Sequence, residues 1–235
     1  MRTRRTRKTR RARGFKRFKE IPRHIMALWV VALVVIVFTL VMVVRLNWGN
    51  EPAVPATFQS EVQAIIDEID WIEQYFLPIN RYSRPGISLD QVNGIVIHNI
   101  GNPGTTALQN RNFFANLAHT GERFASSNFI ICLDGSILQC VPIDEIAYAS
   151  NIRNYDTISI EVCHPYADGR FTEASYLAVV HLTAWLSIAF DLTSEDVIRH
   201  ADIIATDCPR YFTYNEDAWE RFRADVDSAI AEMRN

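Results

Sequence analysis

The sequence GIVIH occupies residues 94–98. It is a short apolar run without polar alternation, which is typical of a strand covered on both faces of its sheet. A sheet covered in this way needs helices on each side, so the run predicts a layered α/β domain. TISIEVC, residues 157–163, predicts another strand of the same sheet.

The segments around these two strands predict the rest of one domain. Residues 106–109 form a capping-box pattern that opens a helix, and Asp134-Gly135-Ser136 is a hairpin signal between the apolar runs 129–133 and 137–141. A long helix is expected over residues 172–190 and a final one from about Glu216. We therefore expect an α/β (α+β) domain over residues 85–235, with a mixed central β-sheet flanked by helices.

The N-terminal part has a different composition. Residues 1–24 hold 12 of the 24 Lys and Arg and a single acid, whereas residues 25–235 have a net charge of −14. Residues 25–44, IMALWVVALVVIVFTLVMVV, carry no charge and match a hydrocarbon core of roughly 30 Å. They predict a transmembrane helix. A signal peptide has a shorter apolar run and a small-residue cleavage site, which RLNWGNEP (45–52) does not offer, so an uncleaved anchor is favoured.

The charge distribution predicts the orientation of this anchor. The basic tail 1–24 precedes the apolar run and only Arg45 follows it closely, so the N-terminus is expected in the cytoplasm. The chain would be a single-pass protein of the cell membrane with its folded domain extracytoplasmic. A nucleic-acid-binding tail is the alternative, but topology and anionic lipid account for the basic residues more simply, and no nucleic-acid partner is expected.

A stalk and a helix are expected between the anchor and the domain. Residues 45–57 carry Gly49, Pro52 and Pro55 without periodicity, which indicates a stalk. Residues 58–80 place apolar side chains at helical spacing and predict an amphipathic helix. Whether it packs on the domain or stands apart as a spacer is left open by the sequence.

Three residues form a candidate metal-ligand set. His98 ends the apolar run, His200 follows DVIR (196–199), and Cys208 comes eight residues later, before Pro209. Two imidazoles and a thiolate suit Zn²⁺ and leave its fourth position for water. The alternative for His98 alone is a hydrogen-bonded core histidine, and spacing by itself does not decide between the two.

Four ordered blocks resemble one known family. They are IVIHNIGNPGTT (95–106), SSNFIICLDGSILQCVPIDEIAYAS (126–150), DTISIEVCHP (156–165) and VIRHADIIATDCPRYF (197–212). In this order they resemble the zinc-dependent N-acetylmuramoyl-L-alanine amidases, relatives of the peptidoglycan recognition proteins and phage lysozyme-type amidases. The resemblance covers about residues 92–225. It implies Zn²⁺ on His98, His200 and Cys208, and peptidoglycan as substrate, cleaved between N-acetylmuramic acid and L-alanine.

Two further residues are expected to take part in catalysis. Period-two alternation places Ser159, Glu161 and Cys163 on one face of their strand, and Glu161 matches the general acid/base of family members that use one. A surface carboxylate is the alternative. Thr206 stands where many bacterial members have a lysine and the recognition proteins commonly have threonine, so the resemblance implies a weaker donor to the oxyanion.

Weaker expectations concern the surroundings of the site. Asp202 would accept a ring N–H from a ligand histidine or cap a loop. His164 and Tyr148 would line the groove, as would Asn128, which stands where a histidine is common in the family. Once Cys208 serves as a ligand, three cysteines remain, and buried free thiols are expected of them: Cys132, Cys140 and Cys163.

Two functional classes follow from these residues. The first is a membrane-anchored zinc hydrolase acting on peptidoglycan, in remodelling or degradation of the cell wall. The second is a non-catalytic peptidoglycan-binding module, which the same fold supports when a ligand is lost. The complete set of His98, His200, Cys208 and Glu161 favours the enzyme, and a different amide substrate on the same fold is a third possibility.

Overall fold

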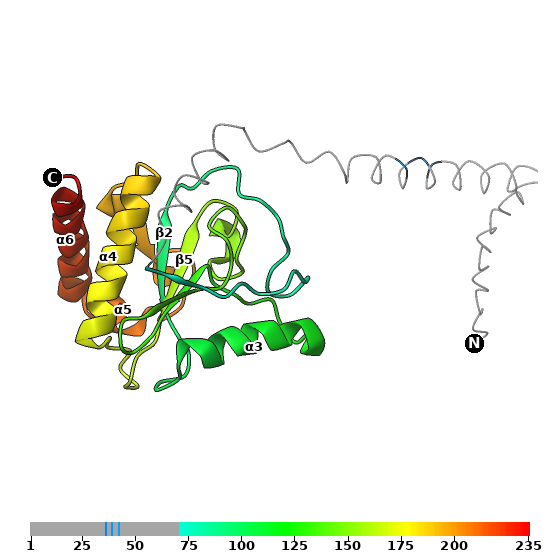
Figure 1. The fold of residues 1–235 in the computed structure, drawn as a ribbon, viewed down its shortest axis with the longest axis horizontal. Helices are drawn as coiled ribbons and strands as arrows, with labels where there is room; N and C mark the ends of the chain where they lie inside the picture. Colours follow the sequence, from blue (N-terminus) through cyan, green and yellow to red (C-terminus); the bar gives the residue numbers. More distant parts are fainter. Residues whose placement is uncertain (1–35, 37–38, 40–41, 43–70) are drawn as a thin grey trace, which may run out of the picture. The chain divides into compact units, whose positions relative to one another are not determined.

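The computed structural model describes residues 71–235 and, before them, only Ile36, Thr39 and Met42, which are helical (Figure 1). The basic tail, the stalk, the first part of the helix expected at 58–80 and, apart from those three residues, the transmembrane helix expected at 25–44 lie outside the described residues. Among the residues described, no helix is both long and apolar enough to cross a bilayer. The membrane anchor therefore stays a prediction.

A mixed six-stranded sheet forms the centre of the domain, as expected. Its order is β1-β4-β3-β5-β2-β6, and only the β3–β4 pair is antiparallel. The predicted hairpin is this antiparallel pair. The strand bounds are β1 Glu73–Gln74, β2 Ile95–Asn99, β3 Phe129–Ile131, β4 Ile137–Gln139, β5 Ile158–Val162 and β6 Val197–Arg199.

Helices cover both faces of the sheet (Figure 1). Alternation along β5 divides its side chains: Ile158 and Ile160 join the larger core on the side of α4 and α6, while Cys163, just after the strand, joins a smaller core with Phe114 of α3. The predicted faces of β5 are thereby confirmed. The helices are α3 Ala107–Thr120, α4 Glu173–Ala189, α5 Arg210–Tyr214 and α6 Glu216–Met233, with 3-10 turns η1 Asn151–Arg153, η2 Ser194–Asp196 and η3 His200–Asp202.

The predicted helix starts are confirmed by their caps. Thr106 accepts a hydrogen bond from the Gln109 amide while the Gln109 side chain accepts one from the Thr106 amide, which completes the capping box of α3. Thr172 caps α4 by accepting from Ser175. These caps explain why both helices begin where the sequence pattern places them.

The prediction of a helix over residues 58–80 is wrong for residues 71–80, the part that the structure describes. Residues 71–80 contain β1 instead of a helix, with Glu73 and Gln74 paired parallel to β4. The backbone continues along β4, because the amide of Leu77 donates to Cys140 at 2.8 Å, and the Leu77 side chain is fully buried. Pairing with a distant strand and burial outweigh the local helical pattern, and Pro78 cannot continue a helix.

Candidate metal centre

Neighbouring parallel strands bring the two predicted histidine ligands together. His98 is the penultimate residue of β2, and His200 opens η3 directly after β6, the strand that pairs with β2. Parallel strands end at the same edge of a sheet, so the two side chains meet there. Cys208 follows η3 and is fastened to it, since the Ala201 amide donates to the Cys208 carbonyl at 2.7 Å.

The spacing of these three residues, called here the metal cluster, fits one ion. Their potential ligand atoms all lie within 4.8 Å of one another. Nδ1 of His98 is 3.7 Å from Sγ of Cys208, and the two imidazole rings are 4.7 Å apart. Tetrahedral Zn²⁺ with its usual bond lengths separates a nitrogen from a sulfur by about 3.6 Å. The cluster therefore matches a three-ligand zinc site.

Burial sets the protonation of the cluster. Burial lowers the pKa of His98 well below its usual value, and the charge of nearby His200 lowers it further. Burial lowers the pKa of His200 as well. Both imidazoles are thus neutral and offer lone pairs. Burial also raises the pKa of the Cys208 thiol, with the charge of Glu161 adding to the effect, so a thiolate here needs a cation beside it.

A loop after the hairpin orients both rings. Nε2 of His98 lies 3.3 Å from Oγ of Ser150, and Nε2 of His200 lies 2.7 Å from Oδ1 of Asn151. Because the Asn151 oxygen can only accept, His200 carries its proton on Nε2 and keeps Nδ1 for a metal. Asn151 was not anticipated as a partner, because nothing in the sequence links two residues 49 positions apart.

Glu161 stands beside the cluster. It is opposite His98 in the β2–β5 register, so the two side chains are on the same face of neighbouring strands. Burial raises the pKa of Glu161 to about 7. Its Oε2 is buried and has no hydrogen-bond partner among the described residues. A carboxyl group that changes protonation near neutrality and is not held by other side chains is suited to proton transfer.

A pocket of about 430 Å³ opens over these residues. The cluster and Glu161 line it together with Tyr148, which was expected at the groove, and Phe124, which was not. The two aromatic rings meet edge to face with centroids 5.3 Å apart. The pocket thus places a metal-binding set, a proton carrier and an aromatic wall around one space.

Asn128 and His164 were expected at the groove, and the structure places both elsewhere. Asn128 is fully buried between β-strands, where its side chain donates to the carbonyls of Pro142 and Glu145 and accepts from Ser159. His164 is buried with its ring nitrogens 2.6 Å and 2.7 Å from the carbonyl oxygens of Tyr166 and Ile100. Neither lines the described pocket, because these hydrogen-bond partners hold each side chain away from it.

Asp202 and Thr206 lie on the segment between His200 and Cys208. The Asp202 carboxylate accepts from the backbone amide and guanidinium of Arg199, so it caps η3, as one of the two expectations had it. Its described hydrogen bonds do not include a ligand histidine. Thr206 is partly buried and is not among the described residues that line the pocket.

The cysteines outside the cluster are free thiols. All four cysteines of the chain lie in the described part, and none forms a disulfide. Burial raises the pKa of Cys140 and of Cys163 to about 12, so both are protonated at neutral pH. Cys132 is only partly buried, and its Sγ accepts a hydrogen bond from the Ala107 amide at 3.3 Å.

Solved structures share this fold. The catalytic domain of XlyA is 25% identical and superposes with a TM-score of 0.56, covering 66% of this chain and 98% of that domain. PlyL is 20% identical with a TM-score of 0.58, covering 67% of this chain and 98% of its own, and shows the fold alone.

Sequence comparisons point to one family. A "Probable N-acetylmuramoyl-L-alanine amidase" of Bacillus licheniformis is 29% identical over 168 residues, which are 66% of this chain and 47% of that protein. The chain thus spans about half the length of such Bacillus relatives. "1,6-anhydro-N-acetylmuramyl-L-alanine amidase AmpD" of Salmonella typhimurium is 27% identical over 55% of this chain and 78% of its own. A family model described as N-acetylmuramoyl-L-alanine amidase matches residues 88–211, more than half of the chain. This chain belongs to the N-acetylmuramoyl-L-alanine amidase family.

Proposed function

We propose that the protein is a membrane-anchored zinc hydrolase that cleaves the amide between N-acetylmuramic acid and L-alanine in peptidoglycan. The observation that carries the proposal is the meeting of His98, His200 and Cys208 within 4.8 Å, with Glu161 opposite His98 on the next strand. Family membership supports the choice of bond, since the matching relatives are named as amidases of this type.

His98, His200 and Cys208 would hold the zinc ion. When bound, Zn²⁺ supplies Lewis acidity, which polarises a carbonyl oxygen and makes a water molecule more acidic. Burial lowers the pKa of both imidazoles and keeps them neutral, so their lone pairs are available to the ion. Asn151 fixes the proton of His200 on Nε2, and Ser150 lies where it can do the same for His98.

Glu161 would carry the proton that hydrolysis moves. Cleavage adds the hydroxyl of water to the carbonyl carbon and breaks the C–N bond, so one proton must leave the water and one must reach the amine of L-alanine. With a pKa raised to about 7 by burial, Glu161 can accept the first proton and donate it to the leaving amine. The absence of a described hydrogen-bond partner leaves Oε2 free for this transfer.

Three further roles complete the proposal. Phe124 and Tyr148 would exclude water from one side of the scissile bond, because their rings form a wall of the same pocket. The proposed donor role of Thr206 rests on the family resemblance and on its position two residues before Cys208. Membrane anchoring rests on the uncharged run 25–44 and the basic residues before it.

Product analysis tests the reaction. The full-length chain is incubated with a defined muramyl-peptide, with zinc present and after chelation, and the products are identified by mass spectrometry. We expect a free peptide beginning with L-alanine, lost on chelation and recovered with zinc. Intact substrate in the presence of folded, zinc-loaded protein would contradict the proposal and favour the non-catalytic peptidoglycan-binding module.

Tag accessibility tests the anchor and its orientation. A tag at the N-terminus should be protected from reagents added to intact cells, whereas one at the C-terminus should react. The chain should also remain in the membrane fraction after a high-salt wash. An N-terminal tag reached from outside, or release by salt, would overturn the proposed topology without touching the proposed chemistry.

A further inference from the structure

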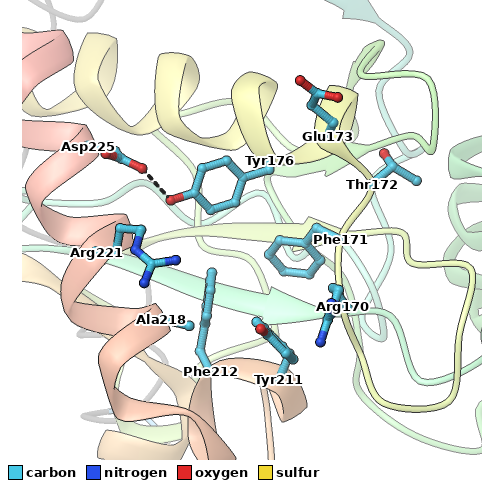
Figure 2. Close-up of a pocket in the computed structure, with 10 residues that line it drawn as sticks. All are labelled: Arg170, Phe171, Thr172, Glu173, Tyr176, Tyr211, Phe212, Ala218, Arg221 and Asp225. Carbon is cyan, nitrogen blue, oxygen red and sulfur yellow. Dashed lines mark hydrogen bonds between the residues drawn. The ribbon is translucent and has the colours of Figure 1, made fainter.

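The domain has a second pocket, of about 290 Å³, and Figure 2 shows the side chains that line it. None of its lining residues lines the pocket over His98. Its walls come from residues 170–172 and the start of α4, from α5 and from α6. Their apolar side chains belong to or pack on the core on that side of the sheet, opposite the core formed with α3. The second pocket is therefore a separate feature that the proposed reaction does not use.

Aromatic rings form the inner surface of the second pocket. Figure 2 shows Phe171, Tyr176, Tyr211 and Phe212 around one space. Phe171 meets Phe212 edge to face with centroids 5.4 Å apart, which fixes both rings. Phe212 is buried beneath this surface, whereas Phe171, Tyr176 and Tyr211 are partly exposed. Partly exposed aromatic rings can pack against the C–H face of a sugar ring.

Polar groups at the rim supply both donors and acceptors. Arg221 makes no hydrogen bond or ion pair with the residues that the structure describes, so its guanidinium donors are available. Asp225 accepts from the Tyr176 hydroxyl at 2.6 Å through Oδ2 and keeps Oδ1 for another partner. Arg170 lies over the Tyr211 ring at 4.8 Å. A ligand with several neutral hydroxyl and amide groups can use both kinds of partner.

Charge balance argues against a purely anionic ligand. Two guanidinium groups, Arg170 and Arg221, line the pocket together with two carboxylates, Glu173 and Asp225. Their opposite charges largely cancel, so the pocket has little net attraction for a phosphate or a carboxylate alone. The volume is at the lower end for ligand sites, which suits a single sugar ring.

We propose that this pocket is an accessory subsite for an N-acetylhexosamine unit of the cell-wall glycan. The proposal rests on the proposed function, which supplies the glycan as the polymer on which the enzyme works. A sugar bound on this side of the sheet is not the one whose amide is cleaved. It retains the enzyme on the polymer and raises the local concentration of cleavable bonds.

Binding of chitotetraose, a soluble N-acetylglucosamine oligomer, tests this subsite by calorimetry on the full-length, zinc-loaded chain. We expect wild type to bind, and Arg221→Ala and Asp225→Asn each to weaken binding roughly tenfold. The matched control is Arg234→Ala, an exposed arginine just beyond α6, which should bind like wild type. Far-UV circular dichroism checks that each variant is folded.

Outcomes separate this subsite from the proposed reaction. Wild type that cleaves muramyl-peptide but does not bind chitotetraose would overturn the subsite and leave the reaction intact. Wild type that binds chitotetraose through Arg221 but does not cleave muramyl-peptide would support the subsite and contradict the reaction. Binding of inorganic phosphate that depends on Arg221, without binding of chitotetraose, would overturn the sugar ligand in favour of an anion.

Discussion

Ser159 and Glu161 lie two residues apart on the same face of β5, yet their polar atoms have opposite surroundings. Ser159 belongs to a buried network with Ser127 and Asn128, in which its hydroxyl contacts Asn128 Oδ1 at 3.0 Å and Ser127 Oγ at 3.2 Å. Glu161 has a buried carboxylate oxygen without a described partner. The Ser159 hydroxyl thus has hydrogen-bond partners, whereas Oε2 of Glu161 has none among the described residues.

The difference contrasts a structural polar residue with the proposed proton carrier. Buried polar groups in proteins are usually satisfied, because each unmade hydrogen bond costs free energy. The Asn128 network, meaning Ser127, Asn128 and Ser159, obeys that rule and ties the loop at residues 142–145 to β5. Glu161 departs from it beside the three side chains of the metal cluster. We infer that the network holds the strand so that Glu161 can be kept free for chemistry.

Glu161→Gln should remove most of the enzymatic activity, which is the largest effect that we expect. Glutamine is similar in shape but cannot carry a proton, so kcat on muramyl-peptide should fall by about 10²–10⁴-fold. Zinc content should stay at the wild-type level, because the three ligands are untouched. Activity within a few fold of wild type would show that Glu161 is not the proton carrier.

Asn128→Ala should destabilise the folded domain. The substitution leaves buried backbone groups of β5 and of the loop at residues 142–145 without partners, so the free energy of unfolding should drop by about 3 kcal/mol. Denaturant unfolding measures this. Asn102→Ala is the matched control, since that side chain is exposed, and it should change stability by less than about 0.5 kcal/mol. Equal stability of the two variants would refute the structural role.

Asn151→Gly should weaken zinc binding at the metal cluster. Asn151 has φ +54°, which glycine adopts without strain, so the variant removes the oxygen that accepts from His200 while preserving the backbone. Zinc affinity should fall by roughly 10–100-fold. Competition with a chromophoric chelator measures it, and an affinity equal to wild type would show that Asn151 does not orient the ring.

Asp202→Ala should have the smallest effect. Its carboxylate, which is 34% exposed, holds Arg199 instead of a ligand histidine. Zinc affinity should change by less than about twofold, and stability by at most about 1 kcal/mol. A loss of zinc affinity as large as that of Asn151→Gly would revive the role of Asp202 as a partner of the metal ligands.

The sequence predicted those parts of the fold that local patterns control. The apolar runs of β2 and β5, the Asp134-Gly135-Ser136 turn and the capping residues Thr106 and Thr172 all act within a few positions of themselves. β1 was mistaken for helix, because only its pairing with β4, more than sixty residues away, makes it a strand. The short α5 carries no periodicity long enough to be seen.

The candidate site divides in the same way. His98, His200, Cys208 and Glu161 were predicted because each follows or lies in a recognisable strand or motif, and the structure brings them together. Asn128 was misplaced because its partners, Ser159 and the carbonyl of Pro142, come from distant segments. Whether a buried polar side chain has hydrogen-bond partners depends on such tertiary contacts. Local sequence patterns do not predict these contacts.

The zinc content of wild type and of Cys208→Ala tests the assignment of the metal centre. Both full-length proteins are purified with zinc, dialysed together and analysed for metal, with circular dichroism to show that each is folded. We expect about one zinc per chain for wild type and almost none for the variant. Equal zinc in the two proteins, or none in folded wild type, would contradict the assignment of His98, His200 and Cys208 as the metal centre.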